Sequence, residues 1–145
     1  MFRLILLCLL LSLMGCNQTF RFYEFELKGK VSLASGTQDP GSVVVELYHK
    51  QTGEGTLQQP LLFVESFKLD KLGEFSKTFE FPVEENRKGL VVYVWHDRDN
   101  DGTFCAIGQA SEFSGIVDVT DFPKRTVTLN LSLDKSCLGV EALYP

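Results

Sequence analysis

Three aspartates at alternate positions give one short stretch of this chain the spacing of a metal-binding loop. Residues 96–103 read His-Asp-Arg-Asp-Asn-Asp-Gly-Thr, and the carboxylates fall at Asp97, Asp99 and Asp101. Gly102 permits the sharp turn that lets such carboxylates converge, and the backbone carbonyl of Thr103 would add a further oxygen. Because calcium prefers carboxylate and carbonyl oxygens, the spacing predicts a calcium-binding loop.

The predicted loop lacks the second half of an EF-hand. Cys105 holds the ninth position, Gly108 replaces the bidentate glutamate of the twelfth, and no flanking helices are indicated. A site here would take its missing carboxylate from Glu112 or Asp118, and we expect weak binding, about 0.1 to 1 mM. The alternative is a tight turn, in which Asp and Asn side chains accept hydrogen bonds from nearby backbone amides.

The sequence carries no recognisable catalytic motif. It has no G-x-S-x-G, no H-E-x-x-H and no glycine-rich phosphate loop, and its only histidines are His49 and His96. We expect His49 in a turn. His96, at a strand end beside Asp97, could orient a proton-transfer group, but a histidine that caps a buried strand is the commoner arrangement. We therefore expect no enzyme, and a hydrolase built on His96 is the least favoured alternative.

The elements that must position the acidic loop are β-strands. In most segments apolar and polar residues alternate, as in half-buried strands, whereas residues 90–95 are apolar on both faces and predict a central, covered strand. The expected strands are residues 23–33, 42–48, 61–69, 75–83, 90–95, 114–120 and 126–133. Residues 70–73 have the composition of a hairpin turn. This all-β pattern predicts a single antiparallel β-sandwich of about seven strands, immunoglobulin-like or transthyretin-like, over residues 23–145.

The central strand and the acidic loop also resemble a known family. The run Val92-Tyr-Val-Trp-His-Asp-Arg-Asp-Asn-Asp-Gly102, followed by Glu112-Phe-Ser-Gly115, is similar to a family of uncharacterised exported bacterial β-sandwich proteins. In that family a hydrophobic strand runs into a His-Asp-x-Asn-x-Asn/Asp-Gly loop, with a Glu and a Gly-Phe-Ser-like stretch downstream. Here Asp99 stands where asparagine is more usual, and Cys105 has no counterpart. The resemblance implies the sandwich and a special loop, but no activity.

Residues 1–15 have the pattern of an export signal. Arg3 supplies a positive charge and an apolar run, residues 4–13, follows it, which is too short for a bilayer span of about 20 residues. The tetrapeptide Leu13-Met-Gly-Cys16 resembles the lipobox of bacterial lipoproteins, which implies cleavage before Cys16 and a covalent lipid on its thiol. Residues 16–22 would then form the lipidated N-terminus and a short tether. The alternatives are an ordinary secretory signal cut elsewhere and an uncleaved anchor.

The cysteine count fits an exported chain. Of four cysteines, Cys8 leaves with the signal and Cys16 takes the lipid, so that Cys105 and Cys137 remain. An even remainder in an exported chain predicts a disulfide between them. Two separate buried thiols are the alternative.

The charge of the chain bears on its partners. The formal net charge is −5, and it becomes −6 once residues 1–15 are removed, because Arg3 is their only charged side chain. Such a chain lacks the basic surface that binds nucleic acid or anionic headgroups, so the lipid on Cys16 must carry the attachment to the bilayer. Phe20, Phe22 and Tyr23 follow the anchor closely, and they either touch the headgroups or open the first strand and face the core.

These features together predict a membrane-anchored, non-catalytic lipoprotein of the bacterial cell envelope. We expect it to dock onto, or stabilise, another envelope protein. Asn17, in place of an aspartate that resembles an inner-membrane retention signal, favours the outer membrane over the inner. The alternative is a calcium-assisted module that binds carbohydrate or another small ligand, and its expected calcium ligands are Asp97, Asp99, Asp101, Thr103 and Glu112.

Overall fold

The structure, a computed structural model, describes residues 21–50, 61–83, 89–105, 111–119 and 121–139. These residues form strands and connecting turns. The strands are β1 (Arg21–Leu33), β2 (Ser42–Lys50), β3 (Leu62–Leu69), β4 (Gly73–Val83), β5 (Gly89–Asp97), β6 (Phe113–Val119), β7 (Thr126–Leu133) and the short β8 (Lys135–Ser136). The seven long strands match the predicted segments to within about two residues at each end, the usual uncertainty of an element boundary.

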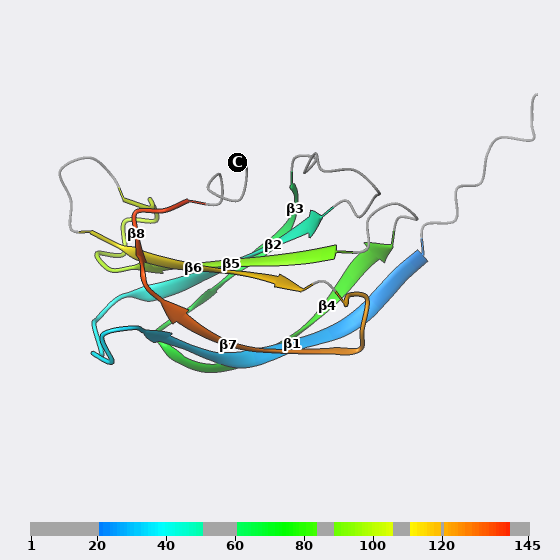
Figure 1. Cartoon of the computed structure of the whole chain (residues 1–145), viewed down its shortest axis with the longest axis horizontal. Helices are drawn as coiled ribbons and strands as arrows, with labels where there is room; N and C mark the ends of the chain where they lie inside the picture. The colour runs from blue at the N-terminus through cyan, green and yellow to red at the C-terminus, as the bar shows by residue number, and fades with distance from the viewer. Residues whose placement is uncertain (1–20, 51–60, 84–88, 106–110, 120, 140–145) are drawn as a thin grey trace, which may run out of the picture.

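Two sheets pack face to face, which confirms the predicted all-β sandwich (Figure 1). One sheet has the order β4-β1-β7 and the other the order β3-β2-β5-β6-β8. Neighbouring strands are antiparallel except β1 and β7, which run parallel, so the prediction of an antiparallel sandwich is wrong for this one pair. The reason is that the chain leaves the larger sheet after β6 and enters β7 at the end where β1 also begins. The order differs from that of a constant-type immunoglobulin domain, where the first strand pairs with the second.

The turn between β3 and β4 is not the hairpin turn that its composition predicts. β3 belongs to the five-stranded sheet and β4 to the three-stranded sheet, so residues 70–72 carry the chain from one layer to the other. Leu72 is buried in the core that the two sheets share. Burial of this side chain between the layers explains why a segment with hairpin composition makes a crossing instead.

β5 is the central strand, as its apolar sequence predicts. Every residue of β5 is buried, and the strand pairs with β2 on one side and β6 on the other. Its inward side chains join the core between the sheets, whereas Tyr93 and Trp95 point to the outer face. There Phe104, from the loop after β5, packs against both rings, with centroids 6.1 Å from Tyr93 and 5.5 Å from Trp95. The acidic loop therefore folds back over the larger sheet.

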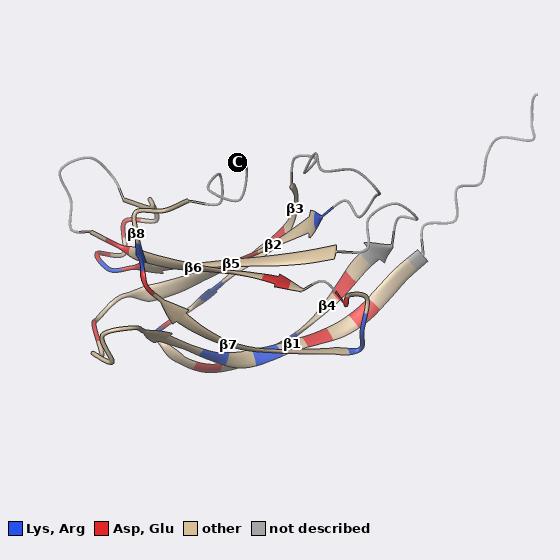
Figure 2. Cartoon of the chain, in the orientation of Figure 1, with Lys and Arg blue, Asp and Glu red and all other residues tan. Residues whose placement is uncertain are grey.

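The sandwich has two distinct ends, which we call the N-terminal end and the acidic end. At the N-terminal end β1 begins and β6 finishes. The contacts of Tyr23 and Phe25 with Phe122, which follows β6, show that these two strand ends lie together. At the acidic end β5 finishes at Asp97 and β6 begins, and β8 lies close by (Figure 1). Between the two ends, charged residues of both signs lie along β1 and β4 (Figure 2). The acidic loop and the start of the sandwich are thus separated by the length of the strands.

Candidate functional site

Three carboxylates meet at the acidic end of the sandwich. One oxygen from each of Asp97, Asp99 and Glu112 lies within 4.8 Å of the other two. Asp97 ends β5 and Glu112 directly precedes β6. Because Trp95 pairs with Ser114 across these two antiparallel strands, positions 97 and 112 come opposite each other. The pairing of β5 with β6 therefore brings Glu112 to the loop.

Asp118, the other carboxylate considered for the loop, lies far from it. It pairs with Val91 across β5 and β6, six residues along β5 from Asp97, a separation of about 20 Å. Its carboxylate forms an ion pair with Lys50 of β2. Of the two candidates, Glu112 alone can join Asp97 at one site.

Hydrogen bonds from its own backbone shape the acidic loop. The amide of Asp101 donates to Oδ1 of Asp99 over 3.2 Å, and the amide of Thr103 donates to Oδ1 of Asp101 over 2.7 Å. Gly102 has a φ of 78°, in the left-handed region that favours glycine. These are the side-chain contacts of a tight turn. The Asp101 carboxylate serves the turn and is not among the three clustered side chains.

Glu112 holds the two ends of the acidic loop. Its buried carboxylate accepts hydrogen bonds from the amide of Arg98 at Oε1 and from the amide of Cys105 at Oε2, each over 2.8 Å. Its backbone carbonyl accepts a third bond, of 2.9 Å, from the amide of Cys137. Glu112 therefore orders the loop whether or not a cation is bound.

The predicted disulfide between Cys105 and Cys137 is present. The Cα atoms of the two cysteines are 5.5 Å apart, and 32 positions separate them in the sequence. The bond joins the end of the acidic loop to the segment directly after β8. Together with Glu112, it fastens the loop to the five-stranded sheet.

Asp97 is a buried, charged group whose two side-chain partners both bind the same carboxylate oxygen. Its side chain is 0% exposed, and Oδ2 accepts hydrogen bonds from Ser42 Oγ (3.3 Å) and Lys68 Nζ (3.0 Å). Burial raises the pKa of Asp97, but the hydrogen bond and charge of Lys68, the Gly102 amide and the Ser42 hydroxyl outweigh it and leave the pKa below its usual value. Among the described residues Oδ1 has no hydrogen-bond partner. One carboxylate oxygen of Asp97 also lies within 4.8 Å of an oxygen of Asp99 and of Glu112.

The sequence gives no signal for Ser42 and Lys68, the two partners of Asp97. Ser42 starts β2 directly opposite Asp97, and Lys68 lies on β3, next to β2 in the sheet. Both depend on the strand order β3-β2-β5, which the sequence pattern does not contain. Lys68, half-exposed, neutralises part of the charge that a metal ion would otherwise balance.

Neither histidine is exposed to solvent. His96 lies on the inner face of β5 and is fully buried. Burial lowers the pKa of His96, and this outweighs the opposing effects of Asp39, the Pro40 backbone and Glu112. The expectation that His49 lies in a turn is wrong: it is inside β2, buried against Phe81 with ring centroids 3.9 Å apart. His49 occupies the next inward position of β2 after Val43, Val45 and Leu47, which is why the strand continues through it.

Comparison with known proteins adds no relative. No family model, no curated protein and no solved structure matches the chain. In the part of the chain that the structure describes, no helix has the length and apolarity needed to cross a membrane. Residues 1–15 and Cys16 lie outside the described residues, so the signal segment and the lipid attachment stay predictions.

Proposed function

We propose that the protein is a lipid-anchored, non-catalytic component of the bacterial cell envelope, at the outer rather than the inner membrane, that docks onto another envelope protein. The observation that carries the proposal is the separation between the start of β1 and the acidic end (Figure 1). A chain anchored at Cys16 would enter the sandwich at one end. The acidic loop would then face partner proteins at the other end.

Simple lengths support this arrangement. Residues 17–20 span at most ~14 Å when fully extended, so the N-terminal end would stay close to the bilayer. β1 has 13 residues and is therefore about 40 Å long. The acidic end would project well beyond the headgroups, where a second envelope protein can reach it.

Burial of both histidines supports a docking role over a hydrolase. A general acid or base must come within hydrogen-bond reach of a substrate. His49 and His96 are both buried in the sandwich, and the lowered pKa of His96 favours its neutral form. The acidic loop, by contrast, presents exposed polar side chains on a framework fixed by Glu112 and the disulfide.

The proposal is tested in cells by fractionation and crosslinking of the full-length protein. We expect wild type in the membrane fraction and Cys16→Ser in the soluble fraction, because without the lipid the acidic domain has no basic surface and too few exposed apolar side chains for stable attachment to a bilayer. A photo-crosslinking residue at exposed Asp101 should capture one discrete partner, whereas the same residue at exposed Glu80, on β4, should capture none. Membrane retention of Cys16→Ser from which residues 1–15 have been removed would refute the anchor, and equal capture from both positions would refute the docking surface.

A second candidate function is calcium-assisted binding of carbohydrate or another small ligand at the acidic end. Two observations favour it: the buried Oδ1 of Asp97 has no hydrogen-bond partner among the described residues, and one oxygen of Asp97 lies near the carboxylates of Asp99 and Glu112. Calcium binds oxygens at about 2.4 Å, so its ligands lie within about 4.8 Å of one another. The three carboxylates satisfy this condition. Waters or a ligand hydroxyl would complete the coordination.

Thermal unfolding in calcium tests this second function. A site with Kd of about 0.1 to 1 mM would stabilise the protein by about 1.4 to 2.7 kcal/mol at 10 mM calcium. The Tm of wild type should therefore rise by about 5 °C over its value in chelator. Asp99→Ala should abolish most of this rise, and Asp121→Ala, which removes another exposed carboxylate after β6, should keep it. An unchanged wild-type Tm would leave the loop as a tight turn only.

A further inference from the structure

Large exposed apolar side chains gather at the N-terminal end of the sandwich. Among the described residues four such side chains are strongly exposed: Phe22 (65%), Phe63 (55%), Leu62 (48%) and Leu138 (38%). Phe22 is the second residue of β1, and Leu62 and Phe63 begin β3. Leu138 alone lies toward the acidic end, beyond β8. Exposed aromatic rings cost free energy in water unless another surface covers them.

The exposed apolar residues at the N-terminal end of the two sheets, Phe22 of β1 and Leu62 of β3, lie at the same level along the strand direction. Phe22 is next to Tyr23, which pairs with Phe81 of β4. The Phe81 ring contacts His49 in the opposite sheet at 3.9 Å between centroids, and His49 pairs with Leu62 of β3. Packed sheets are about 10 Å apart. A flat surface held against this end, perpendicular to the strands, would therefore meet Phe22 and Leu62 together.

We propose that Phe22, Leu62 and Phe63 insert into the interface of the bilayer that carries the lipid anchor, and so hold the sandwich upright with its acidic end outward. This inference rests on the proposed anchor at Cys16. The tether of at most ~14 Å keeps these side chains within reach of the headgroups. Aromatic rings are favoured at that depth, where one part of the ring is apolar and another contacts water.

The charges at this end are balanced only in part, because Glu24 and its cross-strand partner Glu80 are exposed two residues along the strands from Phe22 and would have to stay in water. Lys50, the last residue of β2, forms an ion pair with Asp118 of β6, so neither brings an unbalanced charge to the interface. Tyr48 packs its ring edge-on against Phe63, with centroids 5.7 Å apart, which holds the Phe63 ring in place. The apolar side chains thus project from ordered strands and need little further ordering to contact lipid.

Quenching of tryptophan fluorescence by brominated lipid measures this contact. The lipidated full-length protein is placed in vesicles of phosphatidylethanolamine and phosphatidylglycerol, with or without bromine-labelled phosphatidylcholine. Trp95, the only tryptophan, lies near the acidic end and serves as an internal reference. Phe22→Trp and Phe63→Trp place a second tryptophan at the N-terminal end. Leu138→Trp is the matched control, because it replaces another exposed apolar side chain away from that end.

We expect brominated lipid to reduce the emission of Phe22→Trp and Phe63→Trp by about a third, since interfacial side chains reach about 5 to 10 Å into the boundary region. Wild type and Leu138→Trp should keep their emission. Vesicle flotation is measured in parallel. If the variants float with the vesicles but the tryptophans at 22 and 63 are quenched no more than that at 138, the membrane contact is refuted and the anchor stands. If wild type fails to float, both are refuted.

Discussion

Glu112→Ala should lower the free energy of unfolding by about 3 kcal/mol, because it removes the acceptor of two backbone amides at a buried position. The amides of Arg98 and Cys105 would each lose a hydrogen bond of 2.8 Å. Urea denaturation gives the free energy. Amide hydrogen exchange at Arg98 and Cys105, measured by NMR, shows whether the loss falls on the predicted groups.

The conservative variant separates hydrogen bonding from packing. Glu112→Gln keeps the size of the side chain and one acceptor oxygen, so it should cost about half as much and protect one of the two amides. If the free energy of unfolding of Glu112→Ala lies within about 1 kcal/mol of the wild-type value and both amides stay protected from exchange, then Glu112 does not hold the two ends of the acidic loop. The loop would then be ordered by the disulfide and its own turn contacts.

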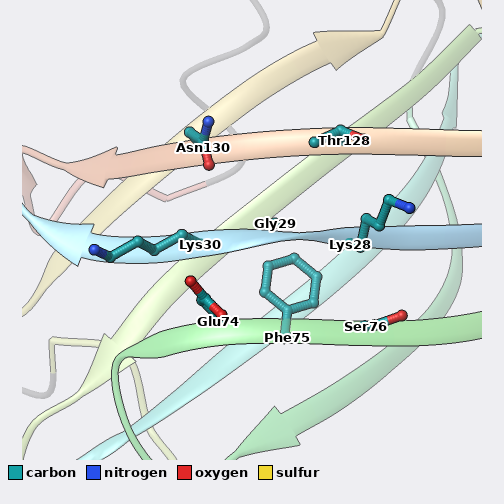
Figure 3. A pocket seen from close by; sticks show the side chains of 8 residues that line it. All are labelled: Lys28, Gly29, Lys30, Glu74, Phe75, Ser76, Thr128 and Asn130. Atoms are coloured by element: carbon teal, nitrogen blue, oxygen red, sulfur yellow. The ribbon is translucent and has the colours of Figure 1, made fainter.

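Gly29→Ala should be still more destabilising, by about 4 kcal/mol, because the added Cβ would fall 1.6 Å from the backbone oxygen of Leu129. Because the clash is with a backbone atom, a change of side-chain rotamer cannot relieve it. The parallel pair of β1 and β7, in which Gly29 faces Leu129, would have to separate. Figure 3 shows the hollow beside Gly29, with the Phe75 side chain of β4 extending toward it. Urea denaturation measures the loss, and hydrogen exchange should show it first in β7.

Gly115→Ala is the matched control for Gly29→Ala. Gly115 is also a glycine inside a strand, but its added Cβ would meet Leu133 Cδ2 at 3.1 Å, a methyl group that can move. We expect a cost of about 1 kcal/mol for this variant. Equal destabilisation by the two variants would show that the close approach of β1 to β7 is not what limits stability.

The strands of this fold are largely readable from the sequence. Period-two alternation in residues 23–33 and 126–133 predicts β1 and β7 because one face of each strand meets the core and the other meets water. The unbroken apolar run of β5 predicts its central position, since only a strand covered on both sides tolerates it. These patterns are local, so they can be recognised in the sequence without knowing which strands pair.

Only part of the candidate site can be predicted from the sequence. The spacing of Asp97, Asp99 and Asp101 predicts a turn with converging oxygens, and the sequence offers Glu112 as a further carboxylate. It cannot rank Glu112 above Asp118, because that choice depends on the register of β5 against β6. Lys68 gives no sequence signal at all, since it reaches Asp97 from two strands away.

By itself the sequence determined the fold class, the strand limits to within about two residues and the identity of the loop with chemical content, and it predicted the pairing of Cys105 with Cys137. Each of these follows from residue type and short-range spacing, or from the count of cysteines. The tertiary structure decided how β1 and β7 run in parallel, which carboxylates meet and which oxygen of Asp97 is left without a partner. It also decided that the exposed apolar residues of β1 and β3 lie at one level. These features depend on strand order and register, which are set by packing between segments far apart in the chain.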